Sequence, residues 1–536
     1  MKISSGAWAR ALGILPGAAE SPVEERIKTE RTILFLIFVL GAFLRFSLLG
    51  QESLWYDEAL SISVAGAARV ADLLEILKSD VHPPLYFVLL HGWMKIFGDS
   101  EAATRAMSAL FGVCTPVLVF VLGRALSLPS TACLLGSFLY ALNTQAIWYS
   151  QEVRMYSLIS FLGTLHLALT ALLFRPRRLR ESSWVLTAGW WITGVLCLYT
   201  HFFGLFFLAA DAAGVCWTVL VLSRSRKPSS PDRVARRRSA AKRLVFRFGV
   251  ASAGWAVAAF PLLLIIASRL RTSHGIDWLD EAHVGWGTPW RILGGLAVGE
   301  QLTTGPWLLR EATMGVFLVV LLCPVLAAAG GRCRRYAWGL PLLFSFTLVG
   351  LPTFISIFRP IIMEGIRYIS IAGAPLCLAG GVGLHLLLRG RWFGRGLMAL
   401  SLCLLLVSDA AYLSSYYRMR EKRMWREAVL YVDSKDASTP MVAFPDHMTV
   451  VLRYYERGSR PIIGWDEHVR DPGKYRRVWF LAEGLPRAVT HDSWTVKSSV
   501  LVSQSFSATS VSVFLLERAL PVEGRPNAPI QNRPLN

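Results

Sequence analysis

Three short motifs in this 536-residue chain carry side chains that could remove a proton or bind an anion. Asp57 and Glu58 lie in "SLWYDEALSI", His82 lies in "DVHPPLYF", and Glu152 and Arg154 lie in "SQEVRMY". A carboxylate can act as a general base toward a hydroxyl group. Arginine suits phosphate because its planar fork donates two parallel hydrogen bonds. These residues could therefore serve one reaction if the fold brings the motifs to the same side of a membrane.

The composition indicates a polytopic membrane protein. The chain is 54% hydrophobic, its mean hydropathy is +0.44, and it contains 19 Trp. Repeated spans of about 20 apolar residues would explain such values. The net charge of +20 does not point to nucleic acid, because the Arg and Lys residues concentrate in short loops between apolar runs, which is typical of positive-inside topology.

The first apolar run, residues 31–50, follows a polar head and lacks a small-x-small cleavage site, so we interpret it as an uncleaved span. The eight cysteines contain no CxxC pair, which argues against a zinc site or a redox motif. Their places in spans or in loops expected in the cytoplasm fit a protein whose outer parts carry no disulfide.

Basic loops set the expected topology. Residues 175–180, 223–247, 331–336 and 389–395 should be cytoplasmic. Apolar runs alternate with these loops and give about eleven spans in total: 31–50, 105–122, 130–149, 155–174, 184–201, 203–222, 246–268, 313–330, 338–357, 367–388 and 395–413. The chain would then begin in the cytoplasm and end outside it.

Residues 84–97, in "HPPLYFVLLHGWMKIFGDS", are apolar but do not fit this alternation as a crossing. A helix of that length extends about 21 Å, which is short against a hydrocarbon core of about 30 Å. Pro83 and Pro84 suit a helix start, while His91 and Lys95 give the helix one polar stripe. We therefore expect an interfacial helix, with the whole loop 51–104 on the outer side. A short tilted span is the alternative.

This topology collects candidate site residues on the outer side, where charges beside the bilayer indicate function. The candidates are Asp57, Glu58, His82, Gln151, Glu152, Arg154, Tyr199, His201, Glu364, Arg367 and Tyr368. Structural explanations stay open for several of them. The two acids at 57 and 58 suit the first turn of a helix, Glu152 could simply pair with Arg154, and His82 could be an uncharged packing residue. Arg367 could snorkel at a span end, and interfacial aromatic residues are common in any case.

A small α/β domain is expected after the last span. "MWREAVLYV" places Trp425, Ala428, Val429 and Val432 on one helical face. "TPMVAFP" and "RRVWFLAEG" are typical of buried strands, and "VVLRYYERG" of a helix that ends at Gly458. The expected organisation is a cytoplasmic segment at 1–31, a transmembrane domain at 32–414, an extracytoplasmic domain at 415–520 and a disordered tail at 521–536.

The motifs together resemble a known superfamily. "WYDEA", "HPPLYF", "FGDSEAATRAMSALFG", "IWYSQEVRMYSL" and "YTHFFG" are similar to bacterial membrane glycosyltransferases of the GT-C fold, related to protein O-mannosyltransferases and to the aminoarabinose transferase of lipid A. The resemblance covers residues 30–215 well and "GIRYISIAGAPLCLAGGVG" more loosely. It implies a polyprenyl-phosphate sugar donor, an active site outside the cytoplasm, and a first outer loop with juxtamembrane helices.

The resemblance also implies roles for the residues. Phosphate is a good leaving group, so the reaction needs one carboxylate base for the acceptor hydroxyl, which the family places at Asp57. One displacement would invert the anomeric centre. Arg154 and Arg367 are candidates for binding the departing phosphate, and Glu152 for orienting Arg154, His82 or the acceptor. His82 could bind the phosphate or help a carboxylate to hold a divalent metal.

The function expected from the sequence is therefore an inverting glycosyltransferase in a bacterial inner membrane, acting on an envelope glycan, lipid or protein. A flippase or transporter of lipid-linked saccharides is the main alternative, although His166, Asp211 and Asp409 do not form the polar line across the bilayer that it would favour. A non-catalytic membrane scaffold is a third possibility. The sequence does not identify the sugar, the acceptor, the metal requirement or the oligomeric state.

Overall fold

The computed structural model describes most of the chain, in two compact units. The first unit comprises Met1–Leu49 and Val64–Ser415, and the second comprises Gly50–Ser63 and Tyr416–Asn536. The described residues are 22–78, 80, 82–173, 184–224, 231–272, 288, 292, 294–296, 307–329, 336–358, 366–418, 422–471, 474–483, 494–502 and 510–518. Most of the expected cytoplasmic head, the basic loop at 175–180, Glu364 and the tail at 521–536 lie outside the described residues.

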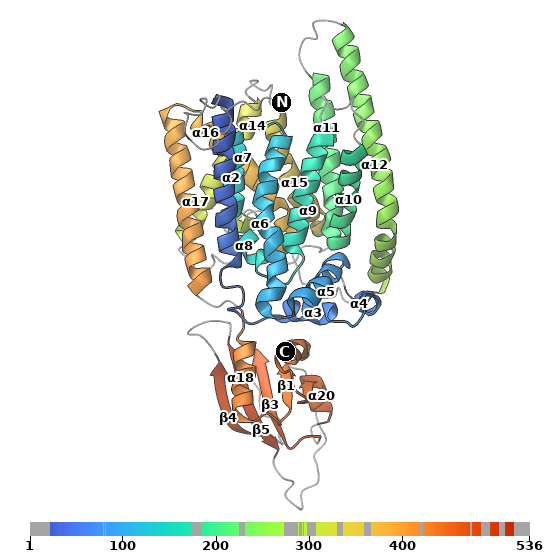
Figure 1. Cartoon of the computed structure of the whole chain (residues 1–536), viewed down its shortest axis with the longest axis vertical. Coiled ribbons are helices and arrows are strands. Elements are labelled where there is room, and N and C mark those ends of the chain that lie inside the picture. The colour runs from blue at the N-terminus through green and yellow to red at the C-terminus, as the bar shows by residue number, and fades with distance from the viewer. Residues whose placement is uncertain are drawn as a thin grey trace, which may run out of the picture. The chain divides into compact units, whose positions relative to one another are not determined.

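The first unit is a helical bundle (Figure 1). Its elements are α2 (Pro22–Phe46), α4 (Val70–Leu77), α5 (Leu85–Phe97), α6 (Glu101–Ala125), α7 (Ser130–Leu142), α8 (Thr144–Ser150), α9 (Tyr156–Leu173), α10 (Trp184–Thr200), η1 (Phe202–Gly204), α11 (Leu205–Arg224), α12 (Pro231–Thr272), α14 (Trp307–Ala329), η4 (Tyr336–Gly339), α15 (Leu340–Phe358), η5 (Ile366–Ala372), α16 (Gly373–Leu388) and α17 (Trp392–Arg418), whose last turn reaches the second unit.

Eight helices in the described part of the chain are long and apolar enough to cross a membrane. Large apolar side chains such as Phe246, Val257 and Phe346 are exposed on them, as expected for surfaces that face lipid rather than water. The three other expected spans correspond to α2, which is not among the eight, and to the shorter apolar helices α7 and α10. The protein is thus a multi-pass membrane protein.

The structure differs from the expected spans at two places. The run 130–149 is not one helix, because α7 stops at Leu142 and α8 starts anew at Thr144. Asn143 causes the break: its side chain accepts a hydrogen bond from the N–H of Ala146 and so caps α8. The expected basic loop 223–247 is partly helical, since α12 begins at Pro231, and proline suits the first position of a helix.

Small residues bring the central helices together. Gly136 on α7 faces the backbone of Leu378 on α16, and Gly381 on α16 faces the backbone of Gly136. A Cβ atom at either glycine would collide with the facing backbone, so the glycines permit an approach that larger residues would block. Helices α7 and α16 both pack against α6, which also contacts α9 and α2.

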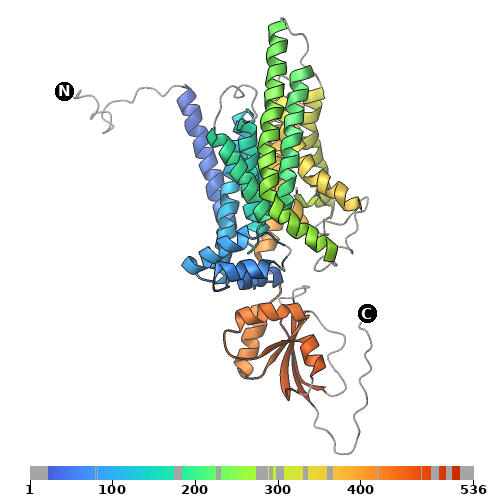
Figure 2. The ribbon, with the colours of Figure 1, turned by 90° about the vertical axis from the view of Figure 1, so that its right-hand side faces the viewer.

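Helix α5 does not extend along the bundle. It has 13 residues and packs against α4, α6 and α10. Figures 1 and 2 show α4 and α5 lying across one end of the bundle. Three internal side chains fix α5 there: Tyr86, Phe87 and Leu90 are almost completely buried. The expectation of a helix that lies at one end rather than crossing is therefore confirmed for this unit.

The second unit contains a five-stranded mixed sheet. The strands are β1 (Met441–Phe444), β2 (Ile462–Gly464), β3 (Arg477–Glu483), β4 (Trp494–Val502) and β5 (Val511–Arg518), in the order β2-β1-β3-β5-β4. β1 pairs in parallel with β2 and β3, whereas β5 runs antiparallel to β3 and β4. The helical elements of the unit are α3 (Tyr56–Ala65), which lies mainly in it, α18 (Trp425–Lys435), η6 (Asp446–Met448), α19 (Thr449–Tyr455) and α20 (Trp465–Arg470).

Both faces of β3 are covered. Val478 and Phe480 join a core cluster with Val442 of β1, against which Trp465 of α20 packs. On the opposite face Trp479 meets the ring of Tyr431 from α18, at a centroid distance of 6.3 Å. The apolar face expected for this helix is confirmed, because its buried residues are Trp425, Ala428, Val429 and Val432. A strand covered on both faces is apolar between its ends, as the five residues 478–482 of β3 are.

A candidate active site at one end of the helical bundle

Three polar side chains of the first unit, those of Asp80, His82 and Arg154, are linked in a row by hydrogen bonds. Nδ1 of His82 lies 2.7 Å from Oδ1 of Asp80, and its Nε2 lies 3.0 Å from Nη2 of Arg154. The backbone N–H of His82 also donates to Oδ1 of Asp80, at 2.9 Å. This Asx-type turn places the carboxylate beside the imidazole. Pro83 and Pro84 then start α5, so the turn is held directly before a rigid helix.

The geometry assigns the proton on His82. A guanidinium group has N–H donors and no acceptor, and it stays charged in proteins. Nε2 of His82 must therefore accept the hydrogen bond from Arg154, which leaves Nδ1 to donate to the Asp80 carboxylate. The result is a neutral imidazole between an anion and a cation, with the tautomer fixed by both neighbours.

Asp80, the acid bonded to His82, stays ionised. Burial acts to raise the pKa of the Asp80 carboxyl. The hydrogen bonds that His82 donates to the carboxylate and the positive charge of Arg154 act in the opposite direction and prevail, so the pKa lies below its usual value. Asp80 thus holds a negative charge that orients His82 and, through it, the cation.

Aromatic residues lie around the hydrogen-bonded side chains of Asp80, His82 and Arg154. The ring of His201, in the loop between α10 and η1, lies 6.5 Å from that of His82 and 5.6 Å from that of Tyr368, measured between centroids. Tyr156 at the start of α9 lies 6.2 Å from His201. The guanidinium of Arg367 lies 6.0 Å from the centroid of the Tyr368 ring. Two cations therefore reach the same aromatic cluster from different parts of the sequence.

His201 is a neutral member of the cluster. Its Nδ1 accepts the backbone N–H of Phe203, at 3.1 Å. Burial lowers the pKa of His201 to about 3, and the neighbouring His82 and Arg154 act in the same direction. Positive charge in this cluster thus belongs to the arginines.

Several hydrogen bonds hold the segment that carries Arg154. Ser108 on α6 donates to the backbone carbonyl of Arg154 at 3.2 Å. Because the single Ser108 hydroxyl proton is used there, the Tyr86 hydroxyl of α5 is the donor in its 3.1 Å contact with Ser108. Nε2 of Gln151 donates to the carbonyl oxygens of Leu44, Arg45 and Ser47, at 3.3, 3.1 and 2.8 Å. The segment is therefore tied to α5, α6 and the C-terminal end of α2.

These contacts place His82, Gln151, Arg154, His201 and Tyr368 at the same end of the bundle. The C-terminal end of α2 and the start of α6 lie there too, because Arg105 of α6 donates to the carbonyl of Leu49 at 2.8 Å. The expected topology also places the C-terminal end of α2, the start of α6 and the segments that carry these side chains on one side of the membrane. Tyr199 points elsewhere: its hydroxyl donates to the carbonyl of Ala258 on α12, at 3.3 Å.

The two acids of "WYDEA" belong to the second unit and differ in their surroundings. Glu58 is fully buried and its Oε2 lies 3.0 Å from Nζ of Lys422, which is 5% exposed. Asp57 is half-buried in the first turn of α3. Of the two neighbouring carboxylates, one is thus neutralised by a buried cation and the other is accessible.

The loop segment around these acids is integrated with the C-terminal residues. Arg426 donates to the carbonyl oxygens of Gly50 and Gln51, at 3.1 and 2.7 Å. Ser53 donates to Glu427 at 2.8 Å, and the backbone N–H of Leu54 donates to the hydroxyl of Tyr455 at 2.6 Å. Residues from both ends of the chain therefore fold together as one unit.

Sequence reasoning missed Asp80, Ser108 and Lys422. The acid two residues before a histidine was a usable signal for Asp80, because Asp side chains bond to the backbone two positions on. Nothing local marks Lys422, which is separated from Glu58 by 364 residues.

Glu152 is buried in the first unit, at 2% exposure, beside residues whose side chains join the cluster. In the described part of the chain, no group of three or more His, Cys, Asp or Glu side chains is arranged to hold a metal ion.

Comparison with known proteins finds similarity in structure. No family model matches the chain, and no curated protein matches its sequence. ArnT from Cupriavidus metallidurans in the apo state aligns with a TM-score of 0.52 and 13% identity, over 92% of this chain and 98% of that one. The same protein bound to undecaprenyl phosphate aligns with the same TM-score and identity, over 90% and 97%.

The archaeal oligosaccharyltransferase AglB from Archaeoglobus fulgidus, solved with an inhibitory peptide and a dolichol-phosphate, aligns with a TM-score of 0.50 and 13% identity. That alignment covers 85% of this chain and 69% of AglB. In another structure of the archaeal enzyme the chain spans 64% of its length. At such low identity these likenesses establish the fold. The chain has the GT-C fold, with a small C-terminal sheet domain.

Proposed function

We propose that this protein is an inverting glycosyltransferase that moves a sugar from a polyprenyl-phosphate donor to an acceptor outside the cytoplasm. One observation carries the proposal: an oriented arginine, Arg154, stands at one end of a GT-C bundle with a neutral histidine bonded to it and a second arginine, Arg367, in the adjoining cluster. The two guanidinium groups are donors that suit a phosphate that gains charge as it leaves, while His82, whose one N–H is bonded to Asp80, orients Arg154. ArnT, which shares the fold, is described as bound to undecaprenyl phosphate.

Asp57 is the proposed base. Phosphate needs no proton in order to leave, but the attacking hydroxyl must lose one, and a single carboxylate serves that purpose. Glu58 is engaged with Lys422, whereas Asp57 is half-buried, so Asp57 is the acid of this pair that an acceptor could reach. Attack from the face opposite the phosphate inverts the anomeric centre. Glu152 is proposed to orient the acceptor or the arginine, and the site is proposed to face away from the cytoplasm of a bacterium.

The acceptor class is left to experiment. Purified protein in lipid nanodiscs would be incubated with donors built on undecaprenyl phosphate and with extracts of envelope lipids, glycans and proteins, and the products identified by mass spectrometry. Transfer is expected with the wild type and is expected to be lost in Asp57→Asn, which keeps the size of the side chain and removes the base. Full transfer by Asp57→Asn would exclude Asp57 as the base. Translocation of the donor without any product would instead support a flippase.

A further inference from the structure

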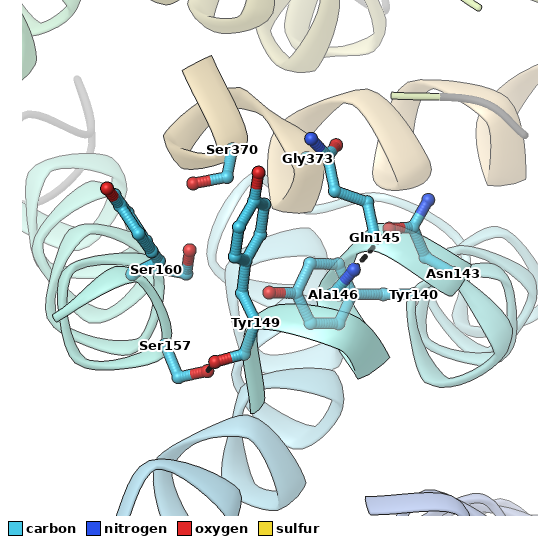
Figure 3. A pocket seen from close by; sticks show the side chains of 10 residues that line it. Tyr140, Asn143, Gln145, Ala146, Tyr149, Ser157, Ser160, Ser370 and Gly373 are labelled. Atoms are coloured by element: carbon cyan, nitrogen blue, oxygen red, sulfur yellow. Dashed lines mark hydrogen bonds between the residues drawn. The ribbon is translucent and has the colours of Figure 1, made fainter. Parts of the chain in front are cut away.

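The cavity at the start of α8 is too small to bind a substrate group (Figure 3). Its volume is about 10 Å³, which is room for about one water molecule. The polar side chains that line it, among them Gln145, Tyr149 and Ser160, suit a guest of that size. A surface with room for a larger molecule lies instead on the outside of the bundle, on helix α12.

Helix α12 is much longer than a membrane span. Its 42 residues extend about 63 Å, against a hydrocarbon core of about 30 Å. Figures 1 and 2 show that it continues past the other helices at the end of the bundle opposite α4 and α5. The sequence of its first part is strongly basic, because residues 231–247 contain six arginines and one lysine but only one acid, Asp232. The first turns of α12 therefore belong at the membrane surface or beyond it.

One side of α12 packs against the bundle and the other faces outward. Leu244 and Trp255 are buried in a core cluster that α12 shares with α10 and α11. Positions 244, 248, 251 and 255 fall on this inner side, since residues three and four apart share a helix face. The outer side carries Phe246, Val257 and Leu264, which are exposed. Large apolar side chains in such a place face lipid.

The outer side changes from apolar to basic within one turn. From Phe246 to Leu264 the helix extends about 27 Å, which is close to the hydrocarbon thickness of about 30 Å. Directly before this stretch Arg238, Lys242 and Arg243 are exposed. These three cations are therefore expected at the level of the phospholipid headgroups, on the side of the helix that meets lipid.

Trp184 marks the same level on the neighbouring helix α10. It is the first residue of α10 and is 77% exposed. Leu186, half a turn further on, packs against the cluster that contains Leu244. Tryptophan concentrates at membrane–water interfaces. The boundary inferred from α12 thus coincides with an interfacial residue on a second helix.

The direction of the three cations matters more than their number. Basic residues at the end of a span are also expected from topology alone. Topology does not require them to face away from the bundle, as Arg238, Lys242 and Arg243 do. Arg243 donates to the hydroxyl of Ser239 at 2.7 Å, and among the described side chains no acid pairs with any of the three. Their positive charge is therefore directed toward the surrounding headgroups.

We propose that residues 238–243 of α12 bind anionic phospholipid, with Arg238, Lys242 and Arg243 contacting the headgroup phosphates. Lysine and arginine side chains beside a membrane attract lipids of net negative charge, whereas a zwitterionic lipid has no net charge to attract. In the proposed orientation of the protein this is the cytoplasmic leaflet, opposite the proposed transfer site. The lipid contact itself does not depend on the transferase function.

A photoreactive residue at position 246 identifies the lipid beside these cations. Benzoylphenylalanine replaces Phe246, which is 71% exposed and lies one turn from Lys242. The full-length protein is placed in nanodiscs with equal amounts of phosphatidylglycerol and phosphatidylcholine that carry the same acyl chains, and cross-linked lipid is identified by mass spectrometry. Phosphatidylglycerol is expected to be captured in excess by roughly tenfold or more. Equal capture of the two lipids would overturn the proposal.

Phe346 on α15 is the matched control position. It is 70% exposed, and residues 336–345 before it contain no Lys or Arg. Benzoylphenylalanine at position 346 is expected to capture the two lipids about equally. A preference for phosphatidylglycerol as large as that at position 246 would show general enrichment around the protein and would refute the assignment to α12.

Two variants with the photoreactive residue at position 246 test the cations themselves. Arg238→Gln/Lys242→Gln/Arg243→Gln is expected to abolish the preference. Lys242→Glu, a single change at an exposed position, is expected to reduce it severalfold, and it serves if the triple variant folds poorly. A preference that persisted in the folded variants would exclude these cations as its source.

A second triple variant controls for net charge. Arg453→Gln/Arg470→Gln/Arg476→Gln removes three exposed arginines of the second unit and is expected to leave the lipid preference unchanged. An equal loss of preference in this variant would contradict a local site on α12. A labelled oligonucleotide tests the alternative partner, a soluble polyanion. If it bound the protein in phosphatidylcholine nanodiscs, lost binding in the α12 triple variant, and the two lipids were captured equally, the surface would belong to that polyanion instead.

Discussion

Nη2 of Arg154 lies 3.0 Å from Nε2 of His82, although the two residues are 72 positions apart and lie on different segments of the bundle. The contact joins a turn before α5 to the irregular segment between α8 and α9. Through Nδ1 of His82 it continues to the Asp80 carboxylate. A charged arginine is thus held by a neutral donor–acceptor relay, which limits the orientations that its planar fork can adopt.

Replacing Arg154 tests whether this fork binds the carrier phosphate. A hydrogen bond to a charged group is worth about 1.5–3 kcal/mol, and each 1.4 kcal/mol is a factor of ten. Arg154→Ala is therefore expected to weaken binding of undecaprenyl phosphate by roughly tenfold to a hundredfold, and to lower kcat/KM for transfer by at least as much. Native mass spectrometry or a lipid-competition assay would measure the affinity.

Arg154→Lys separates charge from geometry at the same position. Lysine keeps the positive charge but presents a point charge instead of a fork. Its affinity for the carrier is expected to fall between those of the wild type and Arg154→Ala. If all three proteins bound the carrier equally, the phosphate would have to be held elsewhere.

Asp80 provides a pH-dependent test of the relay. Its pKa is lower in the folded protein than in an unfolded chain, so ionised Asp80 stabilises the fold. This contribution is fully present above the ordinary aspartate pKa of about 3.9, and it is lost as the pH falls through the lower folded value. Asp80→Asn removes it. The unfolding temperature of the variant is expected to lie below that of the wild type at neutral pH, and the difference should shrink below about pH 4.

A matched measurement distinguishes positioning from general destabilisation. Asp80→Asn is expected to reduce carrier affinity less than Arg154→Ala does, because Asp80 acts on the phosphate only through His82. Asp72→Asn is a suitable control, since this exposed acid on α4 pairs only with the exposed Arg69, at 2.8 Å. A temperature difference between Asp80→Asn and the wild type that stayed constant from pH 7 to pH 3 would contradict the ionised relay.

Much of this architecture follows from local sequence features. Pro83 and Pro84 and the short length of the following apolar run predict a helix that lies across one end of the bundle. The 3.6-residue spacing of Trp425, Ala428, Val429 and Val432 predicts the buried face of α18. Both inferences succeed because helix starts, lengths and faces depend on neighbouring residues.

Other features depend on contacts between distant residues and leave no local signal. Gln151 looks like a site residue in its motif, yet its amide satisfies carbonyl groups at the end of α2. Glu58 looks like a second catalytic acid, yet it is paired with a lysine near the other end of the chain. Only the fold decides whether a polar side chain in a motif meets solvent, a substrate or a backbone group.

The Glu58–Lys422 pair is expected to matter for stability rather than chemistry. Both side chains are buried, and removing one partner leaves an uncompensated charge that costs about 3–5 kcal/mol. Glu58→Gln or Lys422→Met alone should therefore lower the unfolding temperature of the second unit clearly. The double variant Glu58→Leu/Lys422→Met should recover most of the loss, because a well-packed apolar pair can replace a buried ion pair. Single variants as stable as the wild type would show that the pair contributes nothing.

The last test concerns a fully buried polar network between α9, α10 and α11. Oδ2 of Asp211 lies 2.8 Å from Nε2 of His166 and accepts the indole N–H of Trp190 at 3.1 Å, while Oδ1 accepts the hydroxyl proton of Thr170 at 2.8 Å. His166 and Asp211 are completely buried, so their pairing joins α9 to α11 in the interior of the bundle.

Hydrogen bonds inside membranes are worth about 0.6–2 kcal/mol each. Asp211→Leu, which removes all three, is therefore expected to lower the free energy of unfolding by roughly 2–5 kcal/mol while the remaining folded protein binds undecaprenyl phosphate normally. Thr164→Val on α9 is the control, because Thr164 bonds only to the carbonyl of Ser160 in its own helix. Thermal unfolding in nanodiscs would measure the effect, and a variant that kept its stability but lost transport or transfer would instead give this network a functional role.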